Sequence, residues 1–440
     1  MTKLIDRAIP VSRNYWDRAL EERLNFPKCE TGGIKNVDVL IIGGGPAGLS
    51  AAHTLSKFDV NVVLLEGKNI GLSVGNSTGI IDGIDIGEYL FEEAVEKSGE
   101  KTKEMFRKTS TAFEGINKLI DEHNIQCERI KGGLIYFFKD DDLEFYSSIN
   151  SLASTEYRKG VDYCILDKKE IKKLASSDYL QYGIWIKKGM VINPLVLVKN
   201  LAQVVKENGV EIYENSRVLR ISGEENGVLA KTPNATIKAG KVIIATNPYT
   251  IDIEGLPKGI RGKIVPVFQT VAVSTQIPED LLKFNFGWVI RGESYSGLEY
   301  PYGRIHSFNG KKKILVGTGE IQPAYTAQPK LVRKEADMIF EKLFPGKNVR
   351  TEEMFGGFIG QTPDREGLEG FVDENIFLCK IADGISGAVE NGKKAALNIL
   401  GLENVKTSPY RNGHLNTLYG STPSFMKDLI VRVYLKIISL

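Results

Sequence analysis

Short runs of apolar, mostly β-branched residues alternate along the chain with longer stretches in which apolar and charged positions are mixed. Residues 37–42 (VDVLII) and 60–65 (VNVVLL) show the continuous apolar pattern of buried parallel strands. Between them, GGGPAGLSAAHTLSKF predicts a glycine turn that opens a helix. Strand, helix and strand fall within about 30 residues, the length of a βαβ unit.

The same patterns recur further along the chain. Residues 88–125 read as mostly helical, and LIYFF at residues 134–138 predicts a strand. Asn193-Pro194 introduces another helical stretch, for which Gly209 is the predicted C-terminal stop. Short strands are predicted at 210–213, 217–221, 227–231, 241–246, 263–273, 313–316 and 375–378. The last of these leads into a glycine turn and a helix within ADGISGAVENGKKAALNIL.

Strands typical of a nucleotide-binding sheet thus appear near the start, in the middle and near the end of the chain. We therefore expect an α/β fold in which a Rossmann-like domain is interleaved with a second domain built on a mixed or antiparallel sheet. The expected bounds are 1–36 for an N-terminal arm, 37–85, 190–250 and 350–400 for the nucleotide-binding domain, 86–189 and 251–349 for the second domain, and 401–440 for a C-terminal tail. In the arm, Tyr15, Trp16, Leu20 and Leu24 are spaced as on a short helix that lies on the body.

The first glycine turn carries a dinucleotide-binding pattern. Gly43 allows the tight turn, Gly45 allows a pyrophosphate to approach the backbone, and Gly48 lets the helix pack on the strand. The helix N-terminus supplies N–H groups and partial positive charge to the phosphates. Glu66 ends the second strand, where its carboxylate can accept hydrogen bonds from ribose hydroxyls. An ordinary glycine turn is the alternative, but strand, glycines, helix and acid stand here in the expected order. The motif alone does not choose between FAD and NAD.

Composition narrows the class of protein. Lys and Arg number 57 against 55 Asp and Glu, a formal net charge of +2, which argues against a dedicated nucleic-acid binder. The four cysteines are scattered without a C-x-x-C, so we expect neither a metal site nor a disulfide framework. The N-terminal residues lack the apolar segment of a signal peptide, and no run of 18 apolar residues predicts a membrane span. The expected location is the cytoplasm, or the inner face of the membrane if the tail docks there.

Several further stretches occur in the order typical of one family. They are DVLIIGGGPAGLSAAHTLS, VVLLEGKNIG, GMVINPLVLVKNLAQ, VEIYENSRVLRI, KVIIATNPY, KIVPVFQTVAVSTQIPE, KKKILVGTGE, GGFIGQTPDREGLEG and NIFLCKIADGISGAVENGKKAA. With them the chain resembles the D-amino-acid-oxidase-type family of FAD enzymes, which includes glycine and sarcosine oxidases and γ-glutamylputrescine oxidoreductases. The resemblance runs from about Tyr15 to Leu400. The early YWDRAL is similar to the N-terminal arm of the putrescine-type branch.

The resemblance implies FAD as cofactor and a small molecule as substrate. The residues that it assigns to FAD are Gly43, Gly45, Pro46, Ala47, Gly48, Glu66, Gly67, Lys68, Ser73, Val218, Ala245, Thr246, Asp383, Gly384, Ile385, Ser386 and Gly387. The backbone of Val218 would contact the adenine. The loop 383–387 would place a helix N-terminus at the N1/O2 edge of the flavin, where it would stabilise the negative charge of the reduced ring. The alternative is that DGISG only caps a helix.

Departures from the family pattern bear on the cofactor link and the substrate. Gly357 stands where relatives with covalent flavin have a cysteine, and residues 71–83 contain no histidine, so we expect non-covalent FAD. Ile359 and Ala382 stand where glycine-oxidase-like members have carboxylate-binding arginines, and Asn391 replaces the lysine of sarcosine-oxidase-like members. These departures favour a larger amine, or a carboxylate bound by other residues.

Candidate catalytic residues follow from the same resemblance. Tyr300, Tyr302 and Arg304 lie where the family has an aromatic-Arg segment facing the flavin, and ordinary strand packing with a solvated arginine is the alternative. Lys263 lies near a lysine that activates dioxygen in some oxidases, but a surface lysine is the more common reading. His306 could act as an acid or base, or be a solvated loop histidine.

The expected function is FAD-dependent oxidation of an amine or amino-acid-like compound, with hydride transfer to flavin N5 and hydrolysis of the imine. One alternative is a dehydrogenase of a C–O bond, such as glycerol 3-phosphate or a 2-hydroxy acid, that passes electrons to a quinone or another acceptor. Another is an FAD-holding subunit of an electron-transfer complex. Residues 425–440 are predicted to form an amphipathic helix, for which packing on its own domain, an oligomer or partner contact, and docking on a membrane surface all stay open.

Overall fold

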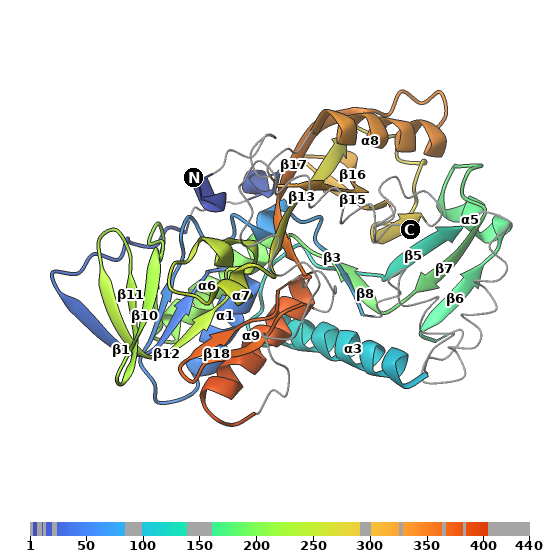
Figure 1. The fold of residues 1–440 in the computed structure, drawn as a ribbon. Helices are drawn as coiled ribbons and strands as arrows, with labels where there is room; N and C mark the ends of the chain where they lie inside the picture. Colours follow the sequence, from blue (N-terminus) through green and yellow to red (C-terminus); the bar gives the residue numbers. More distant parts are fainter. Residues whose placement is uncertain are drawn as a thin grey trace.

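The computed structural model of this chain describes residues 3–6, 11, 15–19, 24–83, 99–138, 161–290, 301–324, 329–362, 367–381 and 384–403. Two eight-stranded sheets and one three-stranded sheet are formed by these residues, with helices packed against the sheets (Figure 1). The α/β fold and the mixed character of the sheets confirm the expected fold class.

The first sheet is assembled from three separate parts of the chain. Its strands are β1 (Ile34–Ile42), β2 (Val62–Leu65), β9 (Glu211–Tyr213), β10 (Arg220–Glu224), β11 (Gly227–Lys231), β12 (Thr236–Ile244), β18 (Gly370–Asp373) and β19 (Ile376–Leu378). Strand β1 pairs in parallel with β12 and β2, and β12 also pairs in parallel with β19. This is the interleaved nucleotide-binding sheet that the separated strand patterns predict.

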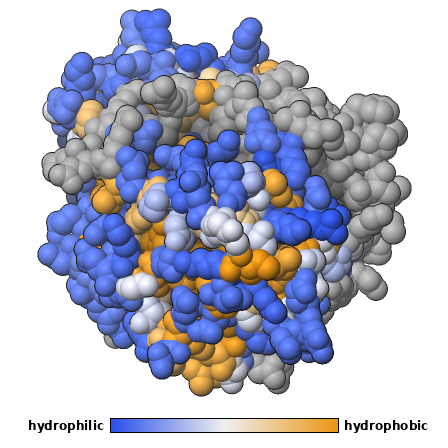
Figure 2. Space-filling model, turned by 90° about the vertical axis from the view of Figure 1, so that its left-hand side faces the viewer, coloured by the Kyte–Doolittle hydropathy of each residue, from blue (hydrophilic) through white to orange (hydrophobic). Residues whose placement is uncertain are grey.

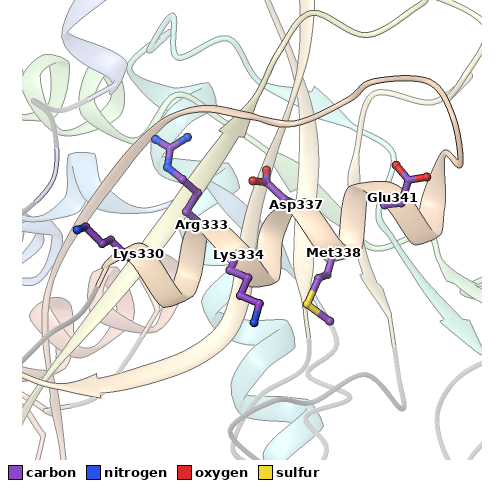
Figure 3. A pocket seen from close by; sticks show the side chains of 6 residues that line it. All are labelled: Lys330, Arg333, Lys334, Asp337, Met338 and Glu341. Carbon is purple, nitrogen blue, oxygen red and sulfur yellow. The ribbon is translucent and has the colours of Figure 1, made fainter.

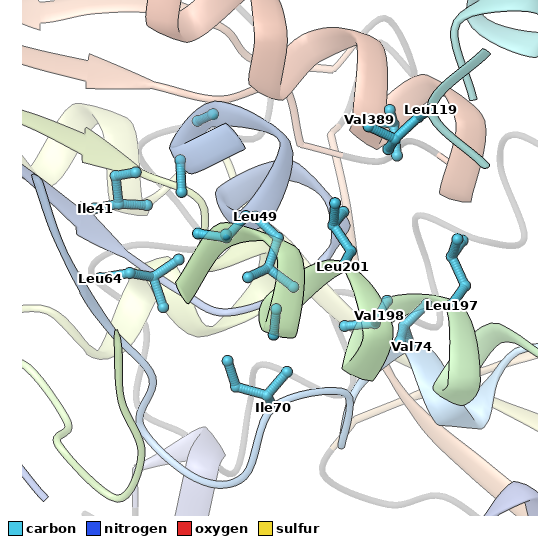
Figure 4. Close-up of a cluster of buried hydrophobic side chains, with 14 of the residues drawn as sticks. Ile41, Leu49, Leu64, Ile70, Val74, Leu119, Leu197, Val198, Leu201 and Val389 are labelled. Carbon is cyan, nitrogen blue, oxygen red and sulfur yellow. The ribbon is translucent and has the colours of Figure 1, made fainter. Parts of the chain in front are cut away.

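Helices cover one face of this sheet and bury most of its apolar side chains. They are α1 (Pro46–Leu55), α3 (Gly99–Glu122), α6 (Pro194–Glu207) and α9 (Ile385–Ile399). Ile41 and Leu64 point toward the helices and pack with Leu49, Leu201 and Val389 (Figure 4). Alternate residues of the same strands join a second cluster on the opposite face, as the two-residue period of a strand requires.

Helices α1 and α9 cross in unusually close contact. A Cβ atom at Gly392 would lie 2.0 Å from the carbonyl oxygen of Ala47, so only glycine fits at the crossing. The Ser50 hydroxyl donates a hydrogen bond of 2.6 Å to the Val389 carbonyl oxygen and fixes the same pair of helices. The N-terminal halves of the two helices are thereby held together.

The second sheet carries the rest of the described chain. In spatial order its strands are β17 (Thr351–Gln361), β13 (Val265–Ser274), β16 (Lys311–Pro323), β15 (Tyr302–Phe308), β14 (Gly287–Ile290), β5 (Leu134–Phe138), β7 (Tyr182–Ile186) and β6 (Tyr163–Leu166). All neighbours are antiparallel except β14 and β5. Helix α8 (Pro329–Leu343) packs on this sheet (Figure 1).

Shorter elements connect the two sheets. The three-stranded sheet consists of β3 (Ile80–Asp82), β8 (Gly189–Val191) and β4 (Ile130–Lys131). The remaining helices are the 3₁₀ turns η1 (Leu4–Asp6), η2 (Tyr15–Ala19), η3 (Val74–Asn76) and η4 (Asn247–Asp252), and the α-helices α5 (Lys168–Leu174) and α7 (Lys258–Arg261). Asn193 caps α6 by accepting a hydrogen bond from the Val196 N–H, and Gly209 follows that helix with φ +90°, as the sequence predicts.

Three details differ from the sequence-based expectations. Strand β17 lies within the segment 350–400 but pairs with β13 in the second sheet, so that segment joins the nucleotide-binding sheet only from β18 onward. Strand β10 begins at Arg220 rather than at Arg217. In the arm, the described helical turn ends at Ala19, and Leu24 lies outside it.

Within the described residues, no helix is both long enough and apolar enough to cross a bilayer. Figure 2 shows the end of the molecule at the left of Figure 1, where hydrophobic patches are interspersed among hydrophilic side chains. The segment 425–440 lies outside the described residues, so its three readings stay predictions.

Replacing Gly392 by valine should separate α1 from α9. The new side chain collides with backbone, and overpacking of this kind costs about 1–3 kcal/mol of unfolding free energy. The measurement is the urea midpoint of the purified protein. Gly223→Ala in β10 is the control, because a Cβ there meets no atom within 4 Å, and its midpoint should equal that of the unsubstituted protein. Equal midpoints for both variants would contradict the tight crossing.

His53 on α1 lies against His123, just past the end of α3, and the titration of His53 should lower the stability of the protein in mild acid. Their Nε2 atoms lie 2.8 Å apart, and burial lowers the pKa of His53 from 6.5 to about 4. Below pH 6.5 the unfolded chain binds a proton that the folded protein excludes, so the unfolding free energy should fall by about 2 kcal/mol between pH 7 and pH 5. Urea midpoints at both pH values should show this drop and a smaller one in His53→Gln. The same drop in both proteins would refute the assignment.

Candidate functional site

The glycine turn after β1 has the shape that the sequence predicts. Gly43 adopts φ +112°, and a Cβ there would lie 2.5 Å from the Ala245 carbonyl oxygen. A Cβ at Gly48 would lie 1.8 Å from the Gly43 carbonyl oxygen, so only glycine fits at this position in the first turn of α1. By contrast, a Cβ at Gly45 would meet nothing within 4 Å. The N-terminus of α1 therefore opens onto free space, where an anionic group can approach its N–H groups.

Glu66 lies beside this turn and is held by backbone N–H groups. One carboxylate oxygen accepts from the Gly44 N–H at 2.7 Å, and the other accepts from the Lys68 N–H at 2.8 Å. Burial is the main cause of its raised pKa, and these two hydrogen bonds partly oppose it. Each carboxylate oxygen can accept a further hydrogen bond, which suits a pair of ribose hydroxyls.

Val218 presents a free backbone edge. Its side chain is buried, and its N–H and C=O make no hydrogen bond with any other residue that the structure describes. On either side, the Arg217 guanidinium pairs with Asp6 and Asp252, and the Leu219 N–H donates to Lys231. A backbone donor and acceptor left open side by side suit the edge of an adenine ring.

The loop 383–387, which the resemblance assigns to FAD, is described only in part, because Ala382 and Asp383 lie outside the described residues. Gly384 is the N-cap of α9, has no side-chain cap and would have nothing within 4 Å of a Cβ. Ile385, Ser386 and Gly387 form the first turn of α9. Among the described residues, no side chain caps the N-terminus of α1 or of α9, as expected of positions that face a ligand.

Strand β17 lies over the segments that connect the two sheets. A Cβ at Gly357 would lie 2.8 Å from the Asn76 side-chain nitrogen, and one at Gly360 would lie 2.6 Å from Asn247 Oδ1. That Asn247 oxygen is buried and has no hydrogen-bond partner among the described residues. Ala245 and Thr246, which the sequence assigns to FAD, directly precede Asn247. A buried acceptor without a donor at this point fits a bound polar molecule.

Arg304 is fully buried, with 1% of its surface exposed, so it is not the solvated side chain of the alternative interpretation. Its guanidinium donates to the carbonyl oxygens of Ile192 at 2.6 Å and Thr78 at 3.4 Å, and it lies over the Trp16 ring. Burial lowers the pKa of Arg304 to about 10, so it remains charged at neutral pH. The buried guanidinium of Arg304 therefore holds the backbone of Thr78, before β3, and of Ile192, after β8.

His306 is buried and is hydrogen-bonded at both ring nitrogens, so the expectation of a solvated loop histidine is wrong. Nδ1 lies 2.8 Å from the Tyr15 hydroxyl, and Nε2 lies 3.2 Å from a carboxylate oxygen of Glu128. The Asn193 amide donates to the other Glu128 oxygen at 3.0 Å. The hydrogen bond from His306 is the largest cause of the lowered pKa of Glu128. The sequence analysis did not identify Glu128 as a partner of His306, and no local motif around Glu128 indicates this contact.

The remaining catalytic candidates are only partly placed. Lys263 is buried between α7 and β13, which overturns the reading of a surface lysine. Tyr302 packs across Gly317 of the neighbouring strand β16, and Tyr300 lies outside the described residues. Ser73 is exposed at the start of η3. The resemblance assigns Ser73 to FAD rather than to catalysis.

Surface hollows also lie away from the glycine turn. A groove of about 460 Å³ follows α8, and its six lining side chains spread along the helix in different directions (Figure 3). A cleft of about 650 Å³ is lined by residues 124–130 and 304–307, including Glu128 and His306. The α8 groove has no convergent polar groups. The candidate cofactor site is the region between the helix N-termini and β17, where the open N–H groups lie and where the Asn247 oxygen finds no hydrogen-bond partner in the described part of the chain.

The geometry fits a dinucleotide with a ring system at one end. The open N-termini of α1 and α9, the acceptor Glu66, the free edge of Val218 and the orphaned Asn247 oxygen would serve a diphosphate, a ribose, an adenine and a flavin. Among the described residues, no three His, Cys, Asp or Glu side chains gather as metal ligands.

Comparison with known proteins agrees with this arrangement. Residues 38–386 match the family model described as FAD dependent oxidoreductase. The chain is 25% identical to a probable oxidoreductase OrdL of Haemophilus influenzae over 96% of this chain and 95% of that protein. It is 28% identical to the γ-glutamylputrescine oxidoreductase of Escherichia coli, over 80% of this chain and 79% of that protein.

Other matches have different chemistry or show the fold alone. A glycerol 3-phosphate dehydrogenase of Caloramator mitchellensis is 28% identical over 52% of this chain and 45% of its own length. The solved structure of an L-amino acid deaminase from Proteus myxofaciens in complex with anthranilate has a TM-score of 0.67 at 13% identity and covers 87% of this chain and 94% of that chain.

Because Gly357 carries no thiol, we predict that FAD is bound non-covalently and is released when the protein unfolds. Gly357 offers no thiol, and Cys29, Cys127 and Cys379 are buried elsewhere. After acid denaturation of the holoprotein and removal of the precipitate, FAD absorbance should stay in the supernatant. Flavin that remains with the precipitated protein would show a covalent link and overturn this prediction.

Proposed function

The chain belongs to the family of FAD dependent oxidoreductases, and on that premise we propose that it oxidises an amine larger than a simple α-amino acid. The observation that carries the proposal is the composition of β17 beside the expected flavin position. From Gly356 to Gly360 this strand presents glycines, Phe358 and Ile359, without a cation to clamp a small carboxylate. The similarity to the γ-glutamylputrescine oxidoreductase supports an amine as the reacting group.

The residues of the chain would hold the cofactor and orient the substrate. Glu66 would accept hydrogen bonds from the ribose, and the N-termini of α1 and α9 would face the diphosphate and the ring. FAD, when bound, supplies the two-electron acceptor for oxidation of the carbon next to the amine. The apolar side chain of Ile359 would exclude water and hold an aliphatic amine in its neutral form, because burial disfavours an ammonium charge.

A second candidate is oxidation of a C–O bond, as in the glycerol 3-phosphate enzymes. The half-chain match to the Caloramator mitchellensis enzyme favours it, and so does the faint likeness of residues 73–83 to the corresponding loop of such enzymes. A phosphate ester needs cations in its pocket, and Ile359 supplies none on β17. We therefore rank the amine first.

Anaerobic reduction of the bound flavin tests the two candidates. Holoprotein under nitrogen should lose its visible flavin band on addition of a diamine or an acylated diamine, and the product should be a carbonyl compound with ammonia or a smaller amine. Glycine and sarcosine should act at least about tenfold less efficiently, since about 1.4 kcal/mol of carboxylate binding is missing. Bleaching by glycerol 3-phosphate or a 2-hydroxy acid, with no response to any amine, would reject the amine in favour of the C–O bond.

Two matched arginine variants test whether β17 contacts the substrate. Ile359→Arg adds the cation that amino-acid oxidases use and should shift preference toward carboxylate-bearing amines. Leu331→Arg adds the same charge at a solvent-exposed position of α8 and should leave preference unchanged. A flavin that no amine or alcohol reduces would support the third interpretation, an FAD-holding subunit.

A further inference from the structure

We propose that the N-terminal arm, defined here by η1 and η2, is part of the cofactor site and retains bound FAD. The arm touches the chain at both ends of the expected FAD position, through contacts between residues far apart in sequence. In Figure 1 the dark blue turns near the N-terminus lie where the two large sheets approach each other. The inference depends on the FAD site and not on the choice of substrate.

The first anchor is ionic and lies at the adenosine end. The Asp6 carboxylate accepts from Arg217 at 2.7 Å and lies 3.9 Å from the Lys68 ammonium. Lys68 is two residues beyond Glu66, and Arg217 directly precedes Val218. One carboxylate of the arm therefore ties together the two segments that would bind ribose and adenine.

The same anchor is reinforced by apolar burial. Leu4 is 1% exposed and packs with Phe268 of β13 and Phe358 of β17. Its N–H donates to Asp252 at 2.9 Å. The turn η1 thus contacts η4, which follows the nucleotide-binding sheet, and it also contacts the edge strand β17 and its neighbour β13 in the second sheet. An adenosine bound along Glu66 and Val218 would have this turn beside it.

The second anchor lies at the opposite end, against the loop that precedes β3. Trp16 is fully buried, and its Nε1 donates to the Ser77 carbonyl oxygen at 2.9 Å. Its ring lies under the guanidinium of Arg304, which in turn holds Thr78. The Tyr15 hydroxyl bonds His306, as described above. The turn η2 thereby fixes the segment that continues from Asn76, the neighbour of Gly357.

A cofactor held between these anchors cannot leave along the arm unless one anchor opens. Opening η1 breaks an ion pair and exposes Leu4, and opening η2 exposes a buried tryptophan. Asp6, Tyr15 and Trp16 are therefore positioning residues that act through Lys68, Arg217, His306 and the loop 77–78. Their removal should speed the release of FAD more than it unfolds the protein.

The test measures FAD release from full-length holoprotein after dilution, by the rise of FAD fluorescence. Asp6→Asn removes the charge at one anchor, and Tyr15→Phe removes one hydroxyl at the other without removing the ring. Each loss is of the order of one hydrogen bond or exposed ion pair, so we expect release to become about fivefold faster in either variant. Asp6→Glu keeps the charge and should restore most of the slow release.

The control is Glu104→Gln, which removes a carboxylate from an exposed ion pair with Lys108 on α3. It should release FAD at the unsubstituted rate. Thermal unfolding of the apoproteins separates the alternatives, because a purely structural arm would lower the apoprotein Tm in Asp6→Asn and Tyr15→Phe and leave FAD release unchanged. That result would overturn the proposal. No substrate enters the assay, so it stays decisive even if no amine is oxidised.

Discussion

The contact between Gly392 and the backbone of Ala47 is the constraint on which the cofactor site depends. Because no side chain separates them, the middle of α9 approaches the first turn of α1, and the two helices are held on one side of the sheet. Gly48 makes the same kind of contact between α1 and the turn after β1. Glycines thus allow the close backbone contacts that shape the site. The free N–H groups at the helix N-termini attract negative charge.

A buried ion pair between Lys199 and Glu214 connects segments that are far apart in sequence. Glu214, 1% exposed, accepts from the N–H groups of Phe26 and Ile70 and from the Lys199 ammonium at 3.2 Å. Lys199 in turn donates to the Leu24 carbonyl oxygen. With three donors around it, this carboxylate is not an uncompensated charge. The ion pair connects the segment 24–26, the loop after Glu66 and helix α6.

Local features of the site could be predicted from the sequence, and long-range ones could not. The turn at Gly43, the position of Glu66 and the cap at Asn193 follow from neighbouring residues. The burial of His306 depends on Tyr15 and Glu128, which lie 291 and 178 residues away in sequence, so no local pattern reveals it. Strand β17 was expected beside the nucleotide-binding sheet because it precedes β18, yet an apolar strand carries no mark of the sheet that it will join.

The order of strands in the first sheet has a consequence for synthesis of the chain. Strand β1 must wait for β12, and β12 must wait for β19 near residue 378, before the parallel core closes. At about 5–20 residues per second, one edge of β1 stays unpaired on the ribosome for roughly 10–40 s. A nascent chain of this protein therefore exposes a hydrophobic edge of β1 for nearly half of its translation, and chaperones that shield such edges would act on it before the cofactor can bind.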